Sequence, residues 1–233
     1  AEENVLSHIS FKAQKGETVA FIGSTGSGKS TLVNLIPRLF DVTSGKVLVD
    51  GVDVREMDIH ELRDKIGFVP QKGVLFSGTI ASNICYGAKD ASQEDMKRAA
   101  RIAQAEDFIE EKEDQYEDPI AQGGSNVSGG QKQRLSIARA IAKNPEIFIF
   151  DDSFSALDFK TDLALRQALK RETKNATTLI VAQRISTIIH ADKILVLDEG
   201  EVAGMGTHKE LLQTCPVYQQ IAKSQLSEEE LDV

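Results

Sequence analysis

Residues 18–31 read TVAFIGSTGSGKST, a short apolar run followed by a glycine-rich turn, a lysine and two hydroxyl residues. The part from Gly23 to Ser30 matches the pattern G-x-x-x-x-G-K-[ST]. Because the pattern directly follows an apolar run and opens a segment with helical spacing, it indicates a phosphate-binding loop (P-loop) between a buried strand and a helix. The stretch therefore predicts an α/β fold built around a site for phosphate groups.

The residue types of this loop suit the phosphates of a nucleotide and a magnesium ion. Glycines let backbone N–H groups point at phosphate oxygens, and the start of the following helix adds the positive end of its dipole. Lys29 is expected to reach the β- and γ-phosphates, and the Ser30 hydroxyl is expected to bind Mg²⁺. The predicted nucleotide contacts of the loop are Gly23, Ser24, Thr25, Gly26, Ser27, Gly28, Lys29, Ser30 and Thr31.

Other apolar runs and helical patterns alternate along the chain. Four runs without polar alternation have the length of strands buried on both faces, at residues 65–70, 147–151, 178–182 and 193–198. Helical patterns separate many of them, at residues 29–40, 131–143, 160–174 and 186–191. This alternation predicts an α/β P-loop NTPase (RecA-like) fold, with a mostly parallel sheet and crossover helices. Peripheral antiparallel strands are expected at residues 46–51 and 201–206.

Between residues 71 and 135 the strand patterns stop and helical patterns replace them. The clearest of these is an amphipathic pattern over residues 92–110. We therefore predict an inserted helical subdomain at residues 72–135, and an ATP-binding-type core at residues 1–71 and 136–233.

Composition excludes several other classes of protein. The 27 Lys and Arg residues stand against 36 Asp and Glu residues, a net charge of −9, so no broad basic face is available for nucleic acid. No run approaches the roughly 20 apolar residues that span a bilayer. The two cysteines, Cys85 and Cys215, form no C-x-x-C pair, which argues against a disulfide framework or a metal cluster.

The run at residues 147–151, IFIFD, ends in a carboxylate, Asp151. A P-loop needs an acidic group from a later strand on the magnesium side of the nucleotide. We therefore expect Asp151 to be the Walker-B aspartate and to bind Mg²⁺ together with Ser30.

Residues 127–131, VSGGQ, and the following KQRLSIARA resemble the LSGGQ signature and helix of ATP-binding cassette (ABC) proteins. The segment SALD at residues 155–158 is similar to the D-loop of that family, and the resemblance runs from about residue 5 to about residue 221. It implies that two nucleotide-binding domains pack head to tail, with each ATP between the P-loop of one domain and the signature of the other. The signature residues expected to contact the partner's ATP are Ser128, Gly129, Gly130 and Gln131.

Gln71 resembles the Q-loop glutamine of the same family, which binds Mg²⁺ and the attacking water and links them to the helical subdomain. Residues 75–84, LFSGTIASNI, resemble a segment of exporter-type cassettes that receives the coupling helices of a transmembrane domain. The resemblance implies an exporter domain that uses Mg-ATP at the cytoplasmic face of the cell membrane. In the alternative, Phe76 and Ile80 are ordinary core residues and the segment has no such meaning.

Three positions depart from the family pattern. Asp152 stands where hydrolytically competent cassettes have Glu, and displacing a catalytic carboxylate by roughly 1 Å can cost on the order of 100-fold in rate. Gln183 replaces the switch (H-loop) histidine, and an amide can donate a hydrogen bond but cannot titrate. Gln122 stands where exporters often carry Glu. The candidate catalytic residues are accordingly Asp152, Gln71 and Gln183, while His190 and His208 lie outside the motif and are expected to be exposed.

Both altered hydrolytic positions belong to the chain's own P-loop site, whereas the signature, with Val127 in place of Leu, is nearly intact. This asymmetry resembles the degenerate half of heterodimeric ABC exporters, so we predict weak hydrolysis and a different partner subunit that carries Glu and His. A slow homodimer is the alternative for the pairing. A soluble ABC-type ATPase or a nucleotide sensor without a transport role is the alternative for the function.

Members of the family stack adenine on an aromatic residue in a strand that precedes the segment at residues 4–11. The chain begins too late to contain that strand, so we expect the N-terminal strand or strands of the core to be missing.

Overall fold

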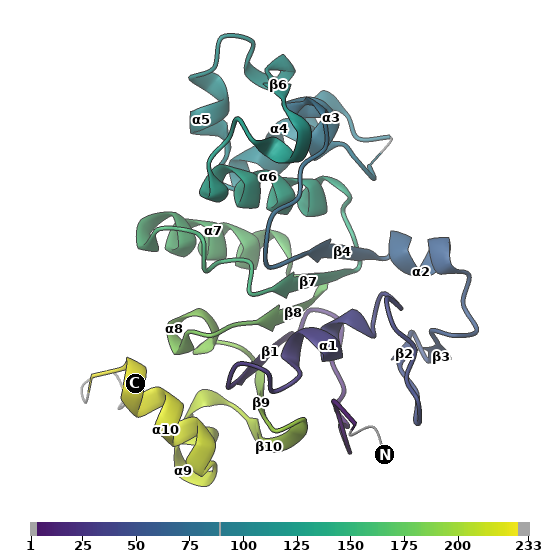
Figure 1. Cartoon of the computed structure of the whole chain (residues 1–233), viewed down its shortest axis with the longest axis vertical. Coiled ribbons are helices and arrows are strands. Elements are labelled where there is room, and N and C mark those ends of the chain that lie inside the picture. The colour runs from purple at the N-terminus through teal and green to yellow at the C-terminus, as the bar shows by residue number, and fades with distance from the viewer. Residues whose placement is uncertain (1–3, 89, 228–233) are drawn as a thin grey trace. The chain divides into compact units, whose positions relative to one another are not determined.

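The computed structural model describes residues 4–88 and 90–227 of the chain, which divides into two compact units (Figure 1). The first unit contains residues 1–66 and 176–233, and the second contains residues 67–175. The expected division into a core at 1–71 and 136–233 and a helical subdomain at 72–135 stays a prediction. Within the described ranges, no helix has the length and apolar character needed to cross a bilayer.

The first unit is built on four strands, which are β1 (Thr18–Gly23), β8 (Thr177–Val181), β9 (Lys193–Asp198) and β10 (Glu201–Gly206). Strand β1 pairs in parallel with both β8 and β9, and Phe21 lies opposite Val181 on one side and Leu195 on the other. Strand β10 is antiparallel to β9. Strand β1 thus has a hydrogen-bonded neighbour on each edge. The side chains of its apolar run are also buried, and Phe21 is fully inaccessible to solvent.

The second unit contributes β4 (Ile66–Val69), apart from its first residue, and β7 (Ile147–Asp151) to the sheet, which has six strands. Two small antiparallel pairs lie outside it, formed by β2 (Leu48–Val49) with β3 (Val52–Asp53), and by β5 (Gly78–Thr79) with β6 (Pro119–Ile120). The predicted α/β fold, with a mostly parallel sheet and peripheral antiparallel strands, is confirmed.

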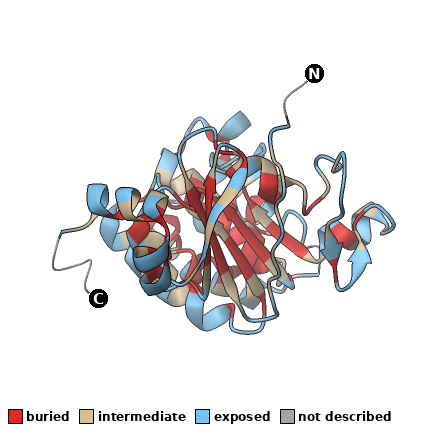
Figure 2. Cartoon of the chain, turned by 90° about the horizontal axis from the view of Figure 1, so that it is seen from below, coloured by how far each residue is buried: buried red, intermediate tan, exposed pale blue. Residues whose placement is uncertain are grey.

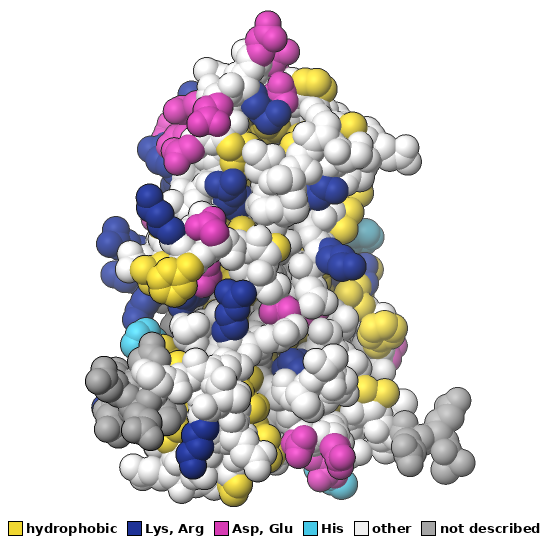
Figure 3. All heavy atoms as spheres, turned by 60° about the vertical axis from the view of Figure 1, so that its left-hand side comes forward, with side chains coloured by type: hydrophobic (Ala, Val, Ile, Leu, Met, Phe, Trp, Pro, Cys, Tyr) yellow, Lys and Arg dark blue, Asp and Glu magenta, His cyan; other side chains and the backbone are white. Residues whose placement is uncertain are grey.

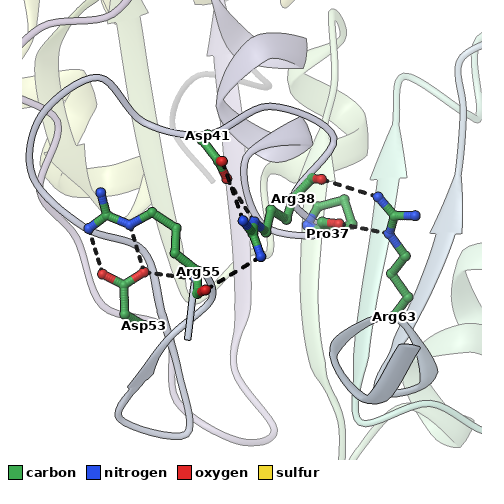
Figure 4. Close-up of polar contacts among 6 residues, drawn as sticks. All are labelled: Pro37, Arg38, Asp41, Asp53, Arg55 and Arg63. Atoms are coloured by element: carbon green, nitrogen blue, oxygen red, sulfur yellow. Dashed lines mark hydrogen bonds and ion pairs between the residues drawn. The ribbon is translucent and has the colours of Figure 1, made fainter. Parts of the chain in front are cut away.

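The helix that follows the P-loop is shorter than expected. Helix α1 (Lys29–Asn34) has six residues, and the chain then turns instead of continuing to residue 40. Pro37 has no N–H to donate to a helical ladder, and Arg38 adopts a left-handed φ of 55°. Arg63 donates hydrogen bonds to the carbonyl oxygens of Pro37 and Arg38, each at 3.1 Å, and Arg38 pairs with Asp41 at 2.8 Å (Figure 4). This network holds the turned segment in place.

The remaining helices of the first unit are α2 (Ile59–Asp64), α8 (Ile185–Ile188), α9 (His208–Thr214) and α10 (Pro216–Gln225). Side chains of α8, α9 and α10 form one core cluster with apolar residues of β1 and β9, among them Ile22, Ile185 and Tyr218. In Figure 2 the central strands are buried along most of their length, while the helices expose their outer faces.

The expectation that His208 is exposed is wrong, whereas His190 is exposed as expected. His208 is 3% exposed, and its Nδ1 lies 2.7 Å from the hydroxyl oxygen of the buried Tyr218. Burial, and after it the nearby charges of His190 and Lys209, lowers the pKa of His208. The residue therefore belongs to the packing between α9 and α10.

The helices of the second unit are α3 (Ile80–Ile84), α4 (Gln93–Ile102), α5 (Glu106–Glu110), α6 (Gly129–Ala142) and α7 (Phe159–Glu172), with short 3₁₀ turns η1 (Gln115–Glu117) and η2 (Gln122–Gly124). The amphipathic stretch at residues 92–110 forms two helices, because the chain breaks between α4 and α5. Gln104 adopts a left-handed φ of 57° at that break, which a continuous helix does not allow.

Candidate functional site

The P-loop connects β1 to α1, and its turn depends on two glycines. Gly26 and Gly28 have φ values of 84° and 94°, in the left-handed region that other residues rarely adopt. A Cβ at Gly28 would also lie 2.5 Å from Cδ2 of Leu6, whereas a Cβ at Gly26 would meet no atom within 4 Å. The loop therefore has an open side at Gly26, where phosphate oxygens can approach backbone N–H groups.

Lys29 lies against the inside of this loop and is only 9% exposed. Its Nζ donates hydrogen bonds to the carbonyl oxygens of Gly23, at 2.8 Å, and Ser24, at 2.7 Å, and to Oγ of Ser27, at 3.3 Å. Phosphate oxygens carry a full negative charge and are stronger acceptors for an ammonium group than carbonyl oxygens are. The arrangement therefore fits a lysine that exchanges loop contacts for phosphate contacts.

The hydroxyl residues of the loop differ in exposure. Ser27 is buried at 2% exposure, while Ser24, Thr25 and Ser30 are exposed and Thr31 is half-buried. Ser27 therefore supports the loop from within. Ser30, in the first turn of α1, is an exposed residue, as a magnesium ligand must be accessible.

A cavity of about 390 Å³ adjoins the P-loop within the first unit. Gln183, one of the three predicted catalytic residues, lines it together with the P-loop residues Gly23, Ser24 and Thr25. The rest of its wall consists of Ile22, Asp198, Val217, Gln220, Ile221, Ser224 and Gln225. In the first unit, Gln183 at the switch position and the P-loop thus line the same cavity.

The second unit brings the other two predicted catalytic residues together. Asp151 is the last residue of β7, and Asp152 follows it with a left-handed φ of 47°; both are 7% exposed. Nε2 of Gln71 donates a hydrogen bond to Oδ2 of Asp152 at 3.0 Å, across 81 positions of sequence. Since the nitrogen of the Gln71 amide is used in this way, its oxygen is the atom that suits a cation.

The loop of Gln71 is also tied to the helix that carries the signature. Gln133, 1% exposed on α6, donates from Nε2 to the carbonyl oxygen of Pro70 at 3.1 Å. A Cβ at Gly73 would lie 2.8 Å from the carbonyl carbon and oxygen of Lys132, so the backbone of the loop lies directly on α6. Gln133 was not among the predicted site residues, and the sequence signal for it was a polar residue inside an apolar helical pattern.

The signature forms the start of α6 through a capping box. Oγ of Ser128 accepts the Gln131 backbone N–H at 3.2 Å, and the Gln131 side chain accepts the Ser128 N–H at 3.0 Å. A Cβ at Gly129 would meet no atom within 4 Å, and Gly130 would gain only one contact, at 3.6 Å with the Ala156 carbonyl oxygen. Nothing in the chain's own packing therefore requires glycine at residue 129, which leaves the start of α6 open to a group from outside.

The D-loop segment leads into α7, whose N-terminus is capped by Asp158. The Asp158 carboxylate accepts hydrogen bonds from the hydroxyl of Thr161, at 2.6 Å, and from its backbone N–H, at 3.0 Å. These two bonds, the hydroxyl bond first, lower the pKa of Asp158. The next residue, Phe159, is 70% exposed.

The segment at residues 75–84 places an aromatic pair at the surface. The rings of Phe76 and Tyr86 stack with centroids 4.4 Å apart, and the two side chains are 43% and 58% exposed. Ile80 is fully buried, so of the two apolar residues considered in the sequence only Ile80 is an ordinary core residue.

Arg139 of α6 supports this aromatic pair. Its guanidinium donates to the carbonyl oxygens of Val74 and Asn83, each at 2.8 Å, and to Oδ1 of Asn83 at 2.9 Å. It also lies 5.2 Å from the ring centroid of Phe76. Burial lowers the pKa of Arg139, and the hydrogen bonds and the cation–π contact compensate for the buried charge.

We expect Arg139→Met to lower the free energy of unfolding by about 2–4 kcal/mol, because it removes three hydrogen bonds together with the cation–π contact. The measurement is urea denaturation followed by circular dichroism. Arg98→Ala is the matched control, since Arg98 pairs with Glu172 at 2.8 Å on the surface and such pairs contribute about 0–1 kcal/mol. Equal losses in the two variants would contradict the supporting role of Arg139.

The donor set for a magnesium ion is present in the chain. The hydroxyl of Ser30, the carboxylate of Asp151 and the amide oxygen of Gln71 are hard oxygen ligands, which are the ligands that Mg²⁺ prefers. Ser30 belongs to the first unit, and Asp151 and Gln71 belong to the second. These residue types fit an ion that also binds the phosphates of a nucleotide.

Comparison with known proteins identifies relatives along nearly the whole chain. The chain is 50% identical over 224 residues to an uncharacterised ABC transporter ATP-binding protein of Mycobacterium tuberculosis. The matched region covers 95% of the chain and 38% of that protein. It is 47% identical over 211 residues to YgaD of Bacillus subtilis, named provisionally as a multidrug export ATP-binding/permease protein, covering 91% of the chain and 36% of YgaD. The chain thus spans less than two fifths of the length of these relatives.

A solved structure of a bacterial Atm1-family ABC exporter with ATP bound has the same fold, with a TM-score of 0.93 and 38% identity over 97% of this chain and 40% of that one. Residues 6–155, which contain the P-loop, the Q-loop, the signature and Asp151, match the family described as ABC transporter. The chain therefore belongs to the ABC transporter family, and it is an ATP-binding domain related to those of exporter-type members.

Proposed function

We propose that the chain is the nucleotide-binding domain of a membrane exporter, and that it binds Mg-ATP head to tail with a second such domain. The observation that carries the proposal is that the chain has two openings suited to phosphate. One is the P-loop with Lys29, and the other is the start of α6 at Ser128 and Gly129, where a side chain would meet nothing. Because residues of the same chain do not cover the start of α6, the signature can bind the nucleotide of a partner domain.

In this proposal, Lys29 and the P-loop backbone bind the β- and γ-phosphates, and Ser30, Asp151 and Gln71 hold Mg²⁺. The ion would neutralise charge on the phosphates and orient them. Asp152 and Gln183 are the groups left to orient the attacking water and the γ-phosphate. Closure of the dimer around ATP would favour one conformation of the membrane-spanning partners, and reopening after hydrolysis would favour another.

We further propose that this P-loop site hydrolyses ATP slowly, and that the physiological partner is a different subunit with Glu and His at these positions. Asp152 supports this, because its short side chain is tied to Gln71 at 3.0 Å. Gln183 supports it because an amide has no proton to exchange near neutral pH. A homodimer with two slow sites is the alternative pairing.

Coupling to a transmembrane domain at the cytoplasmic face of the membrane is also a proposal. Its support is the exposed ring pair of Phe76 and Tyr86, which is held in place by Arg139 and is available for an apolar contact. The name of YgaD and the Atm1-family structure, both of proteins that the chain covers only in part, agree with this role.

A soluble ABC-type ATPase that acts on nucleic acid is less well supported. Figure 3 shows acidic side chains gathered at the upper end of the face that it draws. In the second unit, one short stretch of sequence carries five exposed acidic residues, which are Glu110, Glu111, Glu113, Asp114 and Glu117. Such a concentration of negative charge would repel a phosphate backbone. No observation favours a nucleotide sensor without a transport role over the exporter.

The head-to-tail arrangement can be tested with Gly129→Glu. We expect this variant to keep the ATP affinity of the single chain within about twofold, since its own P-loop is untouched, but to lose Mg-ATP-dependent association because the new carboxylate repels the partner's γ-phosphate. Fluorescent ATP titration measures the first property and sedimentation velocity the second. A loss of ATP affinity in the single chain would contradict the proposal, because it would place the signature at the chain's own nucleotide.

A further inference from the structure

A single side chain at the end of α10 holds the backbone of the switch segment. Nε2 of Gln225 donates a hydrogen bond to the carbonyl oxygen of Gln183 at 2.8 Å. Oε1 of the same side chain accepts the backbone N–H of Ile185, also at 2.8 Å. One carboxamide is thus hydrogen-bonded to two peptide groups of the switch segment, which lie about 40 positions away in the sequence.

The N-cap residue of the helix that follows Gln183 does not accept this N–H. Helix α8 begins at Ile185, and its N-cap residue, Arg184, makes no side-chain hydrogen bond to the helix. Ile185 itself is fully buried, and a buried backbone N–H without an acceptor costs about 1–3 kcal/mol. Gln225 supplies the missing acceptor, so the conformation of the segment depends on the C-terminal helix.

Helix α10 is fixed well enough to act as a support. Tyr218 and Ala222 are fully buried, and they belong to the same core cluster as Ile185 and Ile188 of α8. Gln225, one turn beyond Ala222, is exposed. Its two hydrogen bonds therefore add a directional contact to an apolar attachment that already holds α10 against α8.

The segment that Gln225 holds lies beside the P-loop. Gln183 and Gln225 line the cavity of about 390 Å³ that also borders Gly23, Ser24 and Thr25. The backbone of Gln183 is thus anchored on the α10 side of this cavity, while the P-loop forms another part of its wall. A small shift of α10 would displace the switch residue relative to the P-loop.

We propose that Gln225 is a positioning residue for ATP hydrolysis, which fixes the Gln183 peptide so that its side chain lies correctly for the γ-phosphate. The inference rests on the proposed role of Gln183 as the switch residue. It adds that the C-terminal helix, through one amide, determines where that residue lies. Displacement of α10 would therefore slow the chemical step without weakening the binding of ATP.

The test uses the full chain in single-turnover hydrolysis of radiolabelled ATP with protein in excess, which resolves slow rates. We expect Gln225→Ala to lower the single-turnover rate on the order of 10-fold, since positioning is steep near the transition state, while ATP affinity changes less than about twofold. Lys223→Ala is the matched control, because Lys223 is an exposed residue of the same helix. An unchanged rate in Gln225→Ala, or an equal loss in Lys223→Ala, would overturn the proposal.

Two further variants separate positioning from a merely structural role. Gln225→Glu can still accept the Ile185 N–H but cannot donate to Gln183, so we expect it to be as slow as Gln225→Ala with an unchanged melting temperature. Adding Gln225→Ala to Gln183→Ala should slow hydrolysis no further, because the positioned side chain is already gone. A normal rate in Gln225→Glu, or additive losses in the double variant, would show that Gln225 acts elsewhere.

The single variant Gln183→Ala tells a failure of this inference from a failure of the proposed function. If Gln183→Ala is slow and Gln225→Ala is normal, the positioning role alone is wrong. If Gln183→Ala hydrolyses ATP at the normal rate, Gln183 is not the switch residue. The proposed role of Gln183 and the positioning role of Gln225 are then both wrong.

Discussion

Lys29→Ala is expected to weaken ATP binding by about 10- to 150-fold and to remove measurable hydrolysis. A hydrogen bond to a charged group contributes about 1.5–3 kcal/mol, which corresponds to that loss of affinity. Lys29 is 9% exposed, so its charge acts at a short distance in a place with little water. Removing one donor that stabilises transition-state charge lowers the rate about 100- to 1,000-fold. This loss of rate comes on top of the weaker ATP binding. Fluorescent ATP titration and phosphate release measure the two effects.

The apo protein should tolerate this change. Hydrogen bonds of the Lys29 ammonium go to Gly23, Ser24 and Ser27, all within the loop, so we expect the loss to be confined to the loop and not to affect the core. Lys209→Ala, at an exposed position on α9, is the control and should leave ATP binding unchanged. Undiminished ATP affinity in Lys29→Ala would show that the nucleotide binds away from the P-loop.

Lys29→Arg separates charge from shape at the same position. The guanidinium keeps the positive charge, but it is a planar fork with a different reach from an ammonium group. We expect affinity to recover only in part, because the loop is built around a single compact donor with three acceptors.

The parts of the fold that the sequence predicts best are those decided by local chemistry. The runs ending at Gly23, Asp151 and Asp198 became β1, β7 and β9 with the expected bounds, because an uninterrupted apolar run has one stable place in this fold, a strand covered on both faces. The P-loop pattern is equally local, since its glycines meet conformational demands of the turn itself.

The features that the sequence did not predict depend on single backbone angles or on distant partners. Gln104 divides the amphipathic stretch at residues 92–110 into two helices at a φ of 57°, although nothing in its residue type requires that angle. His208 looks like a surface histidine until Tyr218 is known to lie 2.7 Å from it. The contact of Gln71 with Asp152 spans 81 positions, so no local pattern contains it. The same holds for Gln225, whose partners lie about 40 positions away.

In the slow-site proposal, the geometry around Asp152 favours a longer acid as the base. Its carboxylate is held by Nε2 of Gln71 at 3.0 Å, and its backbone has a left-handed φ of 47°. Asp and Asn tolerate that region better than longer residues do, so a Glu at this position costs up to about 1 kcal/mol of stability. One added methylene would carry the carboxylate past the Gln71 amide. A gain of about 1 Å in reach affects a proton transfer far more strongly than a cost of this size affects the folded population.

Asp152→Glu combined with Gln183→His is therefore expected to raise ATP turnover by about 10- to 100-fold, with a melting temperature that falls slightly. The histidine also introduces a group with an ordinary pKa of about 6.5, so turnover should acquire a pH dependence in that range that the unmodified chain lacks. Phosphate release under conditions in which Mg-ATP induces association is the measurement. Asp152→Asn, which keeps the size of the side chain and removes its charge, is the control and should stay at or below the unmodified rate. Rapid hydrolysis by the unmodified chain would contradict the slow-site proposal, as would a double variant that is no faster, because either result would mean that Asp152 and Gln183 do not limit the reaction.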